Sequence, residues 1–330
     1  MKKLYVLAST LVLASLILSA CGGKATEAPA ATEAPAMTEA PATEAPAMTE
    51  APAMTEAPME KDLLATVLER GYIVVSTDPN YAPQSFLNTE GKRPADTKCP
   101  SDTLTTAEMQ GFDVDVAKAI GESLGVETCF ATPDWDTITA GTWSDKWDVS
   151  VGSMTITPER QEVLDFSVPY YGTPAVVAVG ADSGLTSLDD LAGKAICAGA
   201  STTYETWLNA GDLGPSIAVF AQPPSGITVV PLPTDQECAQ ALAAGREDFV
   251  GYVTSVTVVN ENIASGMPVV QLGEPVFTEV LAAAFDRSSN LDSTSLRAKV
   301  DELFTAMHAD GRLSALSNQW FSVDLTDVSQ

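Results

Sequence analysis

Apolar positions between residues 61 and 321 follow two alternating patterns. Segments with apolar residues three and four positions apart, several of them closed by glycine, predict amphipathic helices, and short continuous apolar runs predict buried strands. The predicted helices cover residues 61–70, 111–126, 135–143, 201–208, 234–245 and 293–321 (the last as two helices), with one turn in 185–193 and a helix start at Thr157. The predicted strands cover residues 72–76, 127–132, 147–154, 174–180, 194–200, 247–255 and 274–286.

This alternation of strands and helices is typical of α/β folds whose sheets are rich in parallel strands. The elements fall into two stretches, residues 60–175 and 176–284, and a helical C-terminus follows them. Residues 88–110 are polar and rich in turn-forming residues, so we expect them to form an excursion that contains Cys99.

The chain starts with a short basic segment and an uncharged apolar run over residues 4–20. A run of this length is marginal for crossing a membrane and typical of a secretory signal. It ends in Leu18-Ser19-Ala20-Cys21, which resembles the lipobox of bacterial lipoproteins. We therefore expect residues 1–20 to be a signal peptide and Cys21 to be the lipidated first residue of the mature protein. A retained anchor helix is the alternative.

Residues 24–59 contain the tetrapeptide Thr-Glu-Ala-Pro six times. The segment has no large branched or aromatic side chain, so burial cannot offset the entropy lost on ordering. We predict that residues 21–59 form a lipidated, disordered tether that spaces the folded part from the membrane.

The charge of the chain excludes several classes of function. It has 17 Lys and Arg against 44 Asp and Glu, a net charge of −27. Nucleic-acid-binding proteins need a basic face, and binding to anionic lipid headgroups needs basic residues too, so neither partner is expected. The single histidine, His308, argues against histidine metal sites and Ser-His-Asp triads. We expect no metal and no cofactor.

Six motifs, in this order, make the chain resemble the family-3 extracellular solute-binding proteins, the amino-acid receptors of ABC importers. Together they are distributed over essentially all of residues 60–321. The matching strings are GYIVVSTDPNYAPQSF, GFDVDVAKAIGESLGV, DWDTITAGTWSDKWDVSVGSMTITPERQEVLDFSVPYY, LDDLAGKAICAGASTTYE, TDQECAQALAAGREDF and MHADGRLSALSNQWF.

The resemblance implies the two-lobed, type II fold of periplasmic binding proteins, in which two crossover strands join two α/β lobes around one ligand. The crossovers are expected near residues 174–179 and 281–286, with the C-terminal helices returning to the first lobe. The first lobe would then comprise residues 60–175 and 285–330, and the second lobe residues 176–284.

The candidate anion site in the first lobe is Arg160 with the residues just before its helix. A guanidinium can grip a carboxylate through two parallel hydrogen bonds. Ser153 and Thr155 can offer N–H groups and hydroxyls to the same anion. Without context Arg160 would be interpreted as a surface ion pair, but the resemblance places it at the family's carboxylate-binding position.

The remaining candidate ligand contacts come from both lobes. Thr202 and Thr203 open a helix in the second lobe, where they can cradle an anion or simply cap the helix. Tyr81 and Trp135 match the two aromatic positions that flank the ligand in the family; taken alone, they fit core packing equally well. Asp78, on the same loop as Tyr81, can hold a cationic group of the ligand or cap the turn.

One position departs from the family pattern. Members that bind α-amino acids usually place an aspartate five residues after the aspartate that opens a second-lobe strand, here Asp248. The residue at that position is Val253, which can offer only its backbone carbonyl. We predict either a ligand whose ammonium is held from the first lobe, by Asp78 or the aromatic faces, or a carboxylate without a free α-amine. The alternative is a frame error of one or two residues.

With Cys21 acylated, four cysteines remain and allow three pairings. Export permits disulfides. Cys99 and Cys129 fall in the implied first lobe and Cys197 and Cys238 in the second, so pairing within lobes leaves closure free and is favoured. A zinc site is the alternative, but no CxxC spacing is present.

Three functions compete on this basis. The favoured one is a monomeric, lipid-anchored protein at the extracytoplasmic face of a bacterial membrane that delivers a small polar solute bearing a carboxylate to an ABC importer permease. The alternatives are an enzyme on the same fold, such as a periplasmic dehydratase, and a ligand sensor for a signalling partner. No motif singles out a catalytic acid or base, so we predict that the protein is not an enzyme.

Overall fold

The computed structural model describes residues 61–328. The predicted signal peptide, the lipidated Cys21 and the repeat tether lie outside the described residues. Within the described part, no helix is both long enough and apolar enough to cross a membrane.

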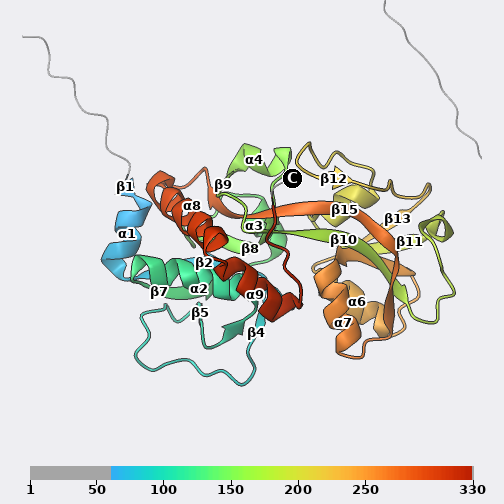
Figure 1. Ribbon diagram of the computed structural model, residues 1–330, viewed down its shortest axis with the longest axis horizontal. Helices are drawn as coiled ribbons and strands as arrows, with labels where there is room; N and C mark the ends of the chain where they lie inside the picture. The colour runs from blue at the N-terminus through green and yellow to red at the C-terminus, as the bar shows by residue number, and fades with distance from the viewer. Residues whose placement is uncertain (1–60, 329–330) are drawn as a thin grey trace, which may run out of the picture. The chain divides into compact units, whose positions relative to one another are not determined.

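The fold is centred on two long antiparallel strands, β10 (Tyr171–Gly180) and β15 (Val269–Asp286). They occupy the middle of a sheet with the path β13-β11-β14-β10-β15-β8-β2-β7-β5, to which β9 and β12 add by pairing with β15. Figure 1 shows β10 and β15 running between the two groups of helices. They are the two crossover strands that the resemblance implies.

We call the elements before β10 and after β15 the first lobe, and those between them the second lobe. The boundaries predicted at 175/176 and 284/285 fall inside β10 and β15, and they stay predictions. The first lobe contains α1 (Leu63–Arg70), β2 (Tyr72–Ser76), β3 (Asn80–Tyr81), β4 (Ser85–Leu87), β5 (Leu104–Thr105), β6 (Met109–Gln110), α2 (Phe112–Leu124), β7 (Glu127–Ala131), α3 (Trp135–Thr139), β8 (Val149–Thr155), α4 (Pro158–Val163), β9 (Leu164–Phe166), α8 (Thr294–Ala309) and α9 (Arg312–Phe321), with the short parallel pair β1 (Lys61–Asp62) and β16 (Leu291–Asp292). The second lobe contains the 3-10 turn η1 (Leu188–Leu191), β11 (Ala195–Gly199), α5 (Thr203–Leu208), β12 (Ala218–Val219), β13 (Thr228–Leu232), α6 (Asp235–Ala243), β14 (Gly251–Ser255) and α7 (Val256–Ala264).

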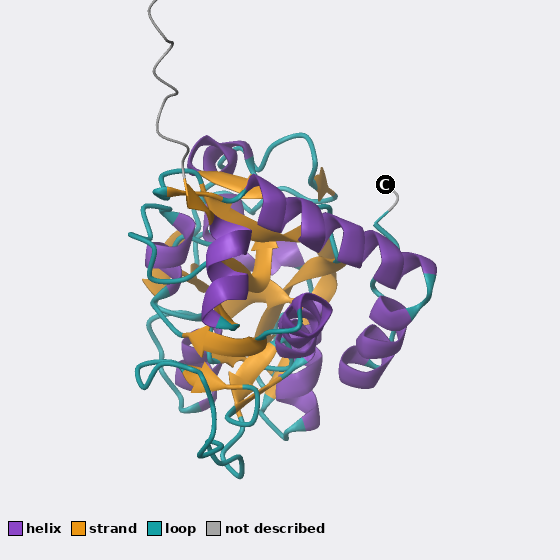
Figure 2. Cartoon of the chain, turned by 90° about the vertical axis from the view of Figure 1, so that its left-hand side faces the viewer, coloured by secondary structure: helices purple, strands orange, loops and turns teal. Residues whose placement is uncertain are grey.

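Each lobe has its own hydrophobic core, and β10 and β15 contribute to both. In the first lobe, Leu281 and Phe285 of β15 pack with residues of α1, α2 and α8. In the second, Val177 of β10 and Leu272 of β15 pack with residues of α5, β11 and β14. The C-terminal helices α8 and α9 contribute to the first-lobe core, as predicted. Figure 2 shows helices on both sides of the strands.

Local signals explain where several helices begin and end. Helix α1 begins after Asp62, whose carboxylate accepts a hydrogen bond from the N–H of Ala65, and ends at Gly71, whose φ of 77° favours glycine. Helix α4 begins after Thr157, whose hydroxyl accepts a hydrogen bond from the N–H of Arg160, as the sequence predicts.

The structure differs from the predicted elements at several places in both lobes. Helix α7 and strand β13 were not predicted, and β15 begins at Val269 rather than at residue 274. Helix α3 ends at Thr139, well short of residue 143. Helix α7 opens with the β-branched residues Val256 to Val259, a composition with low helix propensity, so tertiary packing rather than local preference sets its structure.

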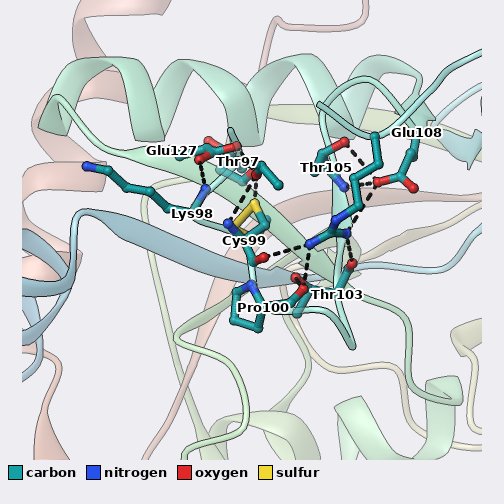
Figure 3. A network of polar contacts seen from close by, with 11 residues as sticks. Thr97, Lys98, Cys99, Pro100, Thr103, Thr105, Glu108 and Glu127 are labelled. Atoms are coloured by element: carbon teal, nitrogen blue, oxygen red, sulfur yellow. Dashed lines mark hydrogen bonds and ion pairs between the residues drawn. A yellow bond between two sulfur atoms is a disulfide. The ribbon is translucent and has the colours of Figure 1, made fainter. Parts of the chain in front are cut away.

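Residues 88–110 form the expected polar excursion, which is tied to β7 (Figure 3). The carboxylate of Glu127 accepts hydrogen bonds from the backbone N–H of Lys98, at 2.6 Å, and from the hydroxyl of Thr97. The Arg93 guanidinium donates to the carbonyls of Thr103, Cys99 and Pro100 at 2.6–2.7 Å. One cation thus satisfies three backbone acceptors in a segment with little regular structure.

Both disulfides favoured by the sequence are present, one in each lobe. Cys99 pairs with Cys129 and joins the excursion to β7. Cys197 pairs with Cys238 and joins β11 to α6. Neither disulfide links the two lobes.

Removing the second-lobe disulfide should destabilise the protein. Its cysteines are 41 residues apart, and the chain-entropy model assigns a loop of that length about 4 kcal/mol. We expect Cys197→Ala/Cys238→Ala to lower the free energy of unfolding by that order, measured by urea unfolding followed by circular dichroism. Cys99→Ala/Cys129→Ala, with a separation of 30 residues, is the matched comparison and should cost slightly less. An unchanged midpoint in both variants would contradict this account.

Candidate functional site

A cavity that is partly open to solvent lies between the two lobes beside β15. All eight ligand-contact residues proposed from the sequence line it. Its lining comprises Asp78, Tyr81, Trp135, Gly152, Ser153, Thr155, Arg160, Thr202, Thr203, Tyr204, Pro233, Thr234, Asp235 and Glu279. Sequence reasoning therefore missed Tyr204, Asp235 and Glu279, the cavity's other aromatic and charged residues.

Arg160 supplies the only cationic side chain in this lining. Its side chain is buried, and Nη1 and Nη2 donate 3.0 Å hydrogen bonds to the carbonyls of Thr155 and Ser201, one in each lobe. The guanidinium carbon lies 5.5 Å from the centre of the Trp135 ring. Burial lowers the pKa of Arg160 to about 10, so it remains charged at neutral pH.

Within residues 61–328, no carboxylate forms an ion pair with Arg160. Glu279 is near enough to act on this charge electrostatically but is not in direct contact, and a buried charge without a direct partner is costly. The guanidinium has five N–H donors, and the two carbonyls use two of them. The remaining donors allow it to bind an anion that enters the cavity.

Glu279, from the middle of β15, is a buried carboxylate that lines the same cavity. Its Oε2 accepts hydrogen bonds of 2.5 Å from the hydroxyls of Thr155 and Thr203. Thr155 ends β8 in the first lobe, and Thr203 opens α5 in the second. One carboxylate oxygen therefore joins both lobes, whereas Oε1 is buried and finds no hydrogen-bond partner in the described part of the chain.

Two further carboxylates line the cavity, Asp78 from the loop after β2 and Asp235 from the start of α6. The carboxylate of Asp235 accepts from the N–H of Gly199 at 2.8 Å and from the hydroxyl of Thr254 at 2.9 Å. Burial raises its pKa to about 7. Asp78 accepts from the N–H of Asn80 at 2.8 Å, and burial raises its pKa as well.

The aromatic and hydroxyl groups of the lining are partly engaged with one another. The hydroxyls of Tyr81 and Tyr204 lie 3.1 Å apart and connect the two lobes. The Trp135 indole N–H is buried and has no partner among the described residues, so it is a free donor at the cavity wall. Thr202 caps α5 by accepting from the N–H of Glu205 at 3.2 Å.

Ser153 lines the cavity but directs its polar groups into the first lobe. Its hydroxyl donates to Asp113 at 2.7 Å and lies 2.6 Å from the Tyr171 hydroxyl, and its N–H donates to the Tyr170 hydroxyl at 3.0 Å. Its φ of 54° is unusual for a residue with a side chain, and such strain is concentrated at functional sites. The same network fixes the carboxylate of Asp113, which also accepts from Tyr170 at 2.7 Å.

Val253 is absent from the cavity lining. It is fully buried in the hydrophobic core of the second lobe, near Val177 and Leu272. The acidic groups at the cavity come instead from other elements, and two of them, Asp235 and Glu279, carried no signal that the sequence analysis used. Glu279 could have been found as the one charged residue in the apolar string VFTEVLAAAF.

Two α/β lobes, two crossover strands and a charged cavity between the lobes define the molecule as a type II solute-binding protein. Residues 73–323 match the model of the bacterial extracellular solute-binding proteins, family 3. The chain belongs to this family, as its sequence motifs indicate.

Individual relatives agree with this assignment. The chain is 29% identical over 274 residues to the L-cystine-binding protein TcyJ of Escherichia coli (strain K12), covering 81% of this chain and 89% of the relative. It is 28% identical to ABC transporter arginine-binding protein 1 of the same strain, covering 65% and 82%.

Solved structures show the same fold. A mutant of ArgBP from T. maritima superposes with a TM-score of 0.63 at 24% identity and covers 79% of this chain and 99% of the other. An ancestral amino-acid-binding protein, AncCDT-1, described as a precursor of cyclohexadienyl dehydratase, gives a TM-score of 0.62 at 26% identity, covering 78% and 99%.

Replacing Asp113 should change how stability depends on pH. Burial raises its pKa to about 7, so between about pH 4 and 7 the folded protein holds a proton that the unfolded chain releases. The stability from this group is therefore present below about pH 4 and is lost as the pH rises through 7, by up to about 1.4 kcal/mol per pH unit. As the pH rises from 5 to 7, the wild type should lose stability that Asp113→Asn keeps. The free energy of unfolding of the variant, measured by urea unfolding, should therefore rise relative to that of the wild type over this range.

The control is Asp182→Asn, at an exposed position in the second lobe, which should keep the wild-type pH dependence. If Asp113→Asn kept it as well, Asp113 would not titrate as its burial requires.

Proposed function

We propose that the protein captures an amino acid, or a related solute bearing a carboxylate, between its lobes and delivers it to the permease of an ABC importer. The observation that carries this proposal is Arg160, a buried and unpaired cation on the cavity wall. It needs an anion, and its planar donor arrangement suits a carboxylate. The relatives named for cystine and arginine binding support the same class of solute.

In this proposal Thr155 and Thr203 place hydroxyls beside the solute, and Tyr81 and Trp135 flank it. Ser153 shapes the wall and Thr202 holds the start of α5. Asp78, which also lines the cavity, is available to a cationic group. The protein acts as a monomer at the extracytoplasmic face of the membrane, held there through the lipid on Cys21.

Replacing Arg160 tests the carboxylate site. Removing a buried charge-assisted contact typically costs 2–5 kcal/mol of binding, so Arg160→Ala should weaken solute binding by about 30-fold or more. Thermal shift against the standard amino acids and L-cystine identifies the solute, and titration calorimetry gives the affinities. Arg312→Ala, at an exposed ion pair with Asp310, is the matched control and should bind like the wild type. Native affinity in a folded Arg160→Ala protein would refute the role of Arg160.

Replacing Cys21 tests the anchor. Cys21→Ala removes the thiol that would receive the acyl chains, so the protein should be released from membranes or remain unprocessed. Fractionation and mass measurement of the N-terminus in a bacterial host would show this. Normal processing and membrane retention of the variant would rule out lipidation at this residue.

An enzymatic role is the second candidate, because AncCDT-1 is described as the precursor of a dehydratase and the cavity holds a buried carboxylate, Glu279. The two functions differ in the fate of the solute. A receptor returns it unchanged after prolonged incubation with excess protein, whereas a dehydratase converts it, and proton NMR of the mixture separates these outcomes.

A further inference from the structure

Glu279 differs from the other carboxylates of the cavity in having a buried oxygen without a hydrogen-bond partner among the described residues. The residue is 1% exposed, it lines the cavity, and Oε1 is buried without a hydrogen bond from any described residue. Asp235 has donors for both of its oxygens. Asp78 lies on a more open part of the wall, where its carboxylate caps a turn.

The orientation of Glu279 is fixed by its other oxygen. Oε2 receives hydroxyl hydrogen bonds from Thr155 and Thr203, which come from opposite lobes. A side chain held at one oxygen by two donors cannot turn to satisfy the second oxygen elsewhere. Leaving a buried charged acceptor unsatisfied costs more than the desolvation of a neutral group, so Oε1 requires a donor, and a cationic donor suits it best.

No side chain of the described lining meets this requirement. Arg160 is its only cation, and its guanidinium donates to the carbonyls of Thr155 and Ser201 rather than to Glu279. The position five residues after Asp248 holds Val253, which is buried in the core of the second lobe. A donor for Oε1 must therefore come from what enters the cavity.

We propose that Oε1 of Glu279 receives the ammonium group of the solute, so that the crossover strand β15 supplies the negative charge that recognises an amino acid. This rests on the proposed function, because the carboxylate of the same solute lies at Arg160. The solute is then held between a guanidinium from α4 and a carboxylate from β15, and a carboxylate lacking the amine leaves Glu279 unpaired. The ammonium is thus recognised between the lobes and not from the first lobe alone.

This arrangement also couples recognition to closure. Thr155 and Thr203 can both donate to Oε2 only while the two lobes are together, because they belong to different lobes. Glu279 therefore presents Oε1 in the binding orientation only in the closed protein. An ammonium that binds there favours the closed state through its differential affinity.

The test compares Glu279→Gln with Glu274→Gln, an exposed glutamate on the same strand. The glutamine keeps the size and an acceptor for Thr155 and Thr203 but loses the charge. The probes are the tightest-binding member of the standard L-amino acids and L-cystine, found with the wild type, and the Nα-acetyl derivative of that amino acid. Titration calorimetry measures all four combinations of variant and probe, alongside the wild type.

We expect Glu279→Gln to weaken binding of the free amino acid by about 30-fold or more, and Glu274→Gln to leave it unchanged. The acetylated probe should bind the wild type at least 30-fold more weakly than the parent, and Glu279→Gln should change its affinity by less than about threefold. Native affinity of Glu279→Gln for the free amino acid overturns the inference and leaves the proposed function standing.

Binding of none of these amino acids to the wild type overturns the proposed function and this inference together. If Glu279→Gln fails to fold, the wild-type comparison of the two probes still decides. Equal affinity for the free and the acetylated amino acid shows that the ammonium is not recognised and overturns the inference.

Discussion

The antiparallel pairing of β10 with β15 is the constraint on which the rest of the molecule depends. At one end of the pairing Tyr171 and Leu281 belong to the first-lobe core, whereas Ala175 with Phe277 and Val177 with Leu272 belong to the second-lobe core. The register shifts between Ala175 and Val177. Because the same two strands enter both cores, each lobe folds around a shared backbone, and Glu279, paired with Thr173, brings this backbone to the cavity.

The cavity concentrates charge at a place where the protein leaves it incompletely neutralised. Arg160 and Glu279 are both buried, and each keeps hydrogen-bonding capacity that the described chain does not use. Isolated buried charges oppose folding, and they persist in a stable protein when a ligand supplies the missing partners. The polar groups of Ser153, in contrast, are satisfied within the first lobe, so this residue gives shape more than affinity.

How far the sequence predicted the structure depended on whether the signal was local. Thr157 with Pro158 predicted the start of α4, and hence the place of Arg160, because capping is decided within one turn. The alternation of strands and helices predicted the fold class. The family motifs identified eight candidate residues, and all eight line one cavity. Helix α7 was missed because its valine-rich start has no local preference for helix. Glu279 stands out in the sequence as a charge within an apolar strand, but its role depends on its partners on β8 and α5, which come together only in the fold.

The excursion of residues 88–110 has a practical consequence. Its contacts described above, through Arg93, Glu127 and the disulfide to Cys129, lead to its own backbone and to β7. None of its residues lines the cavity. Residues 94–96 are exposed between these attachments. A reporter group or an affinity handle placed there would travel with the first lobe, and its distance from a second label on α6 or α7 would make lobe movement directly observable.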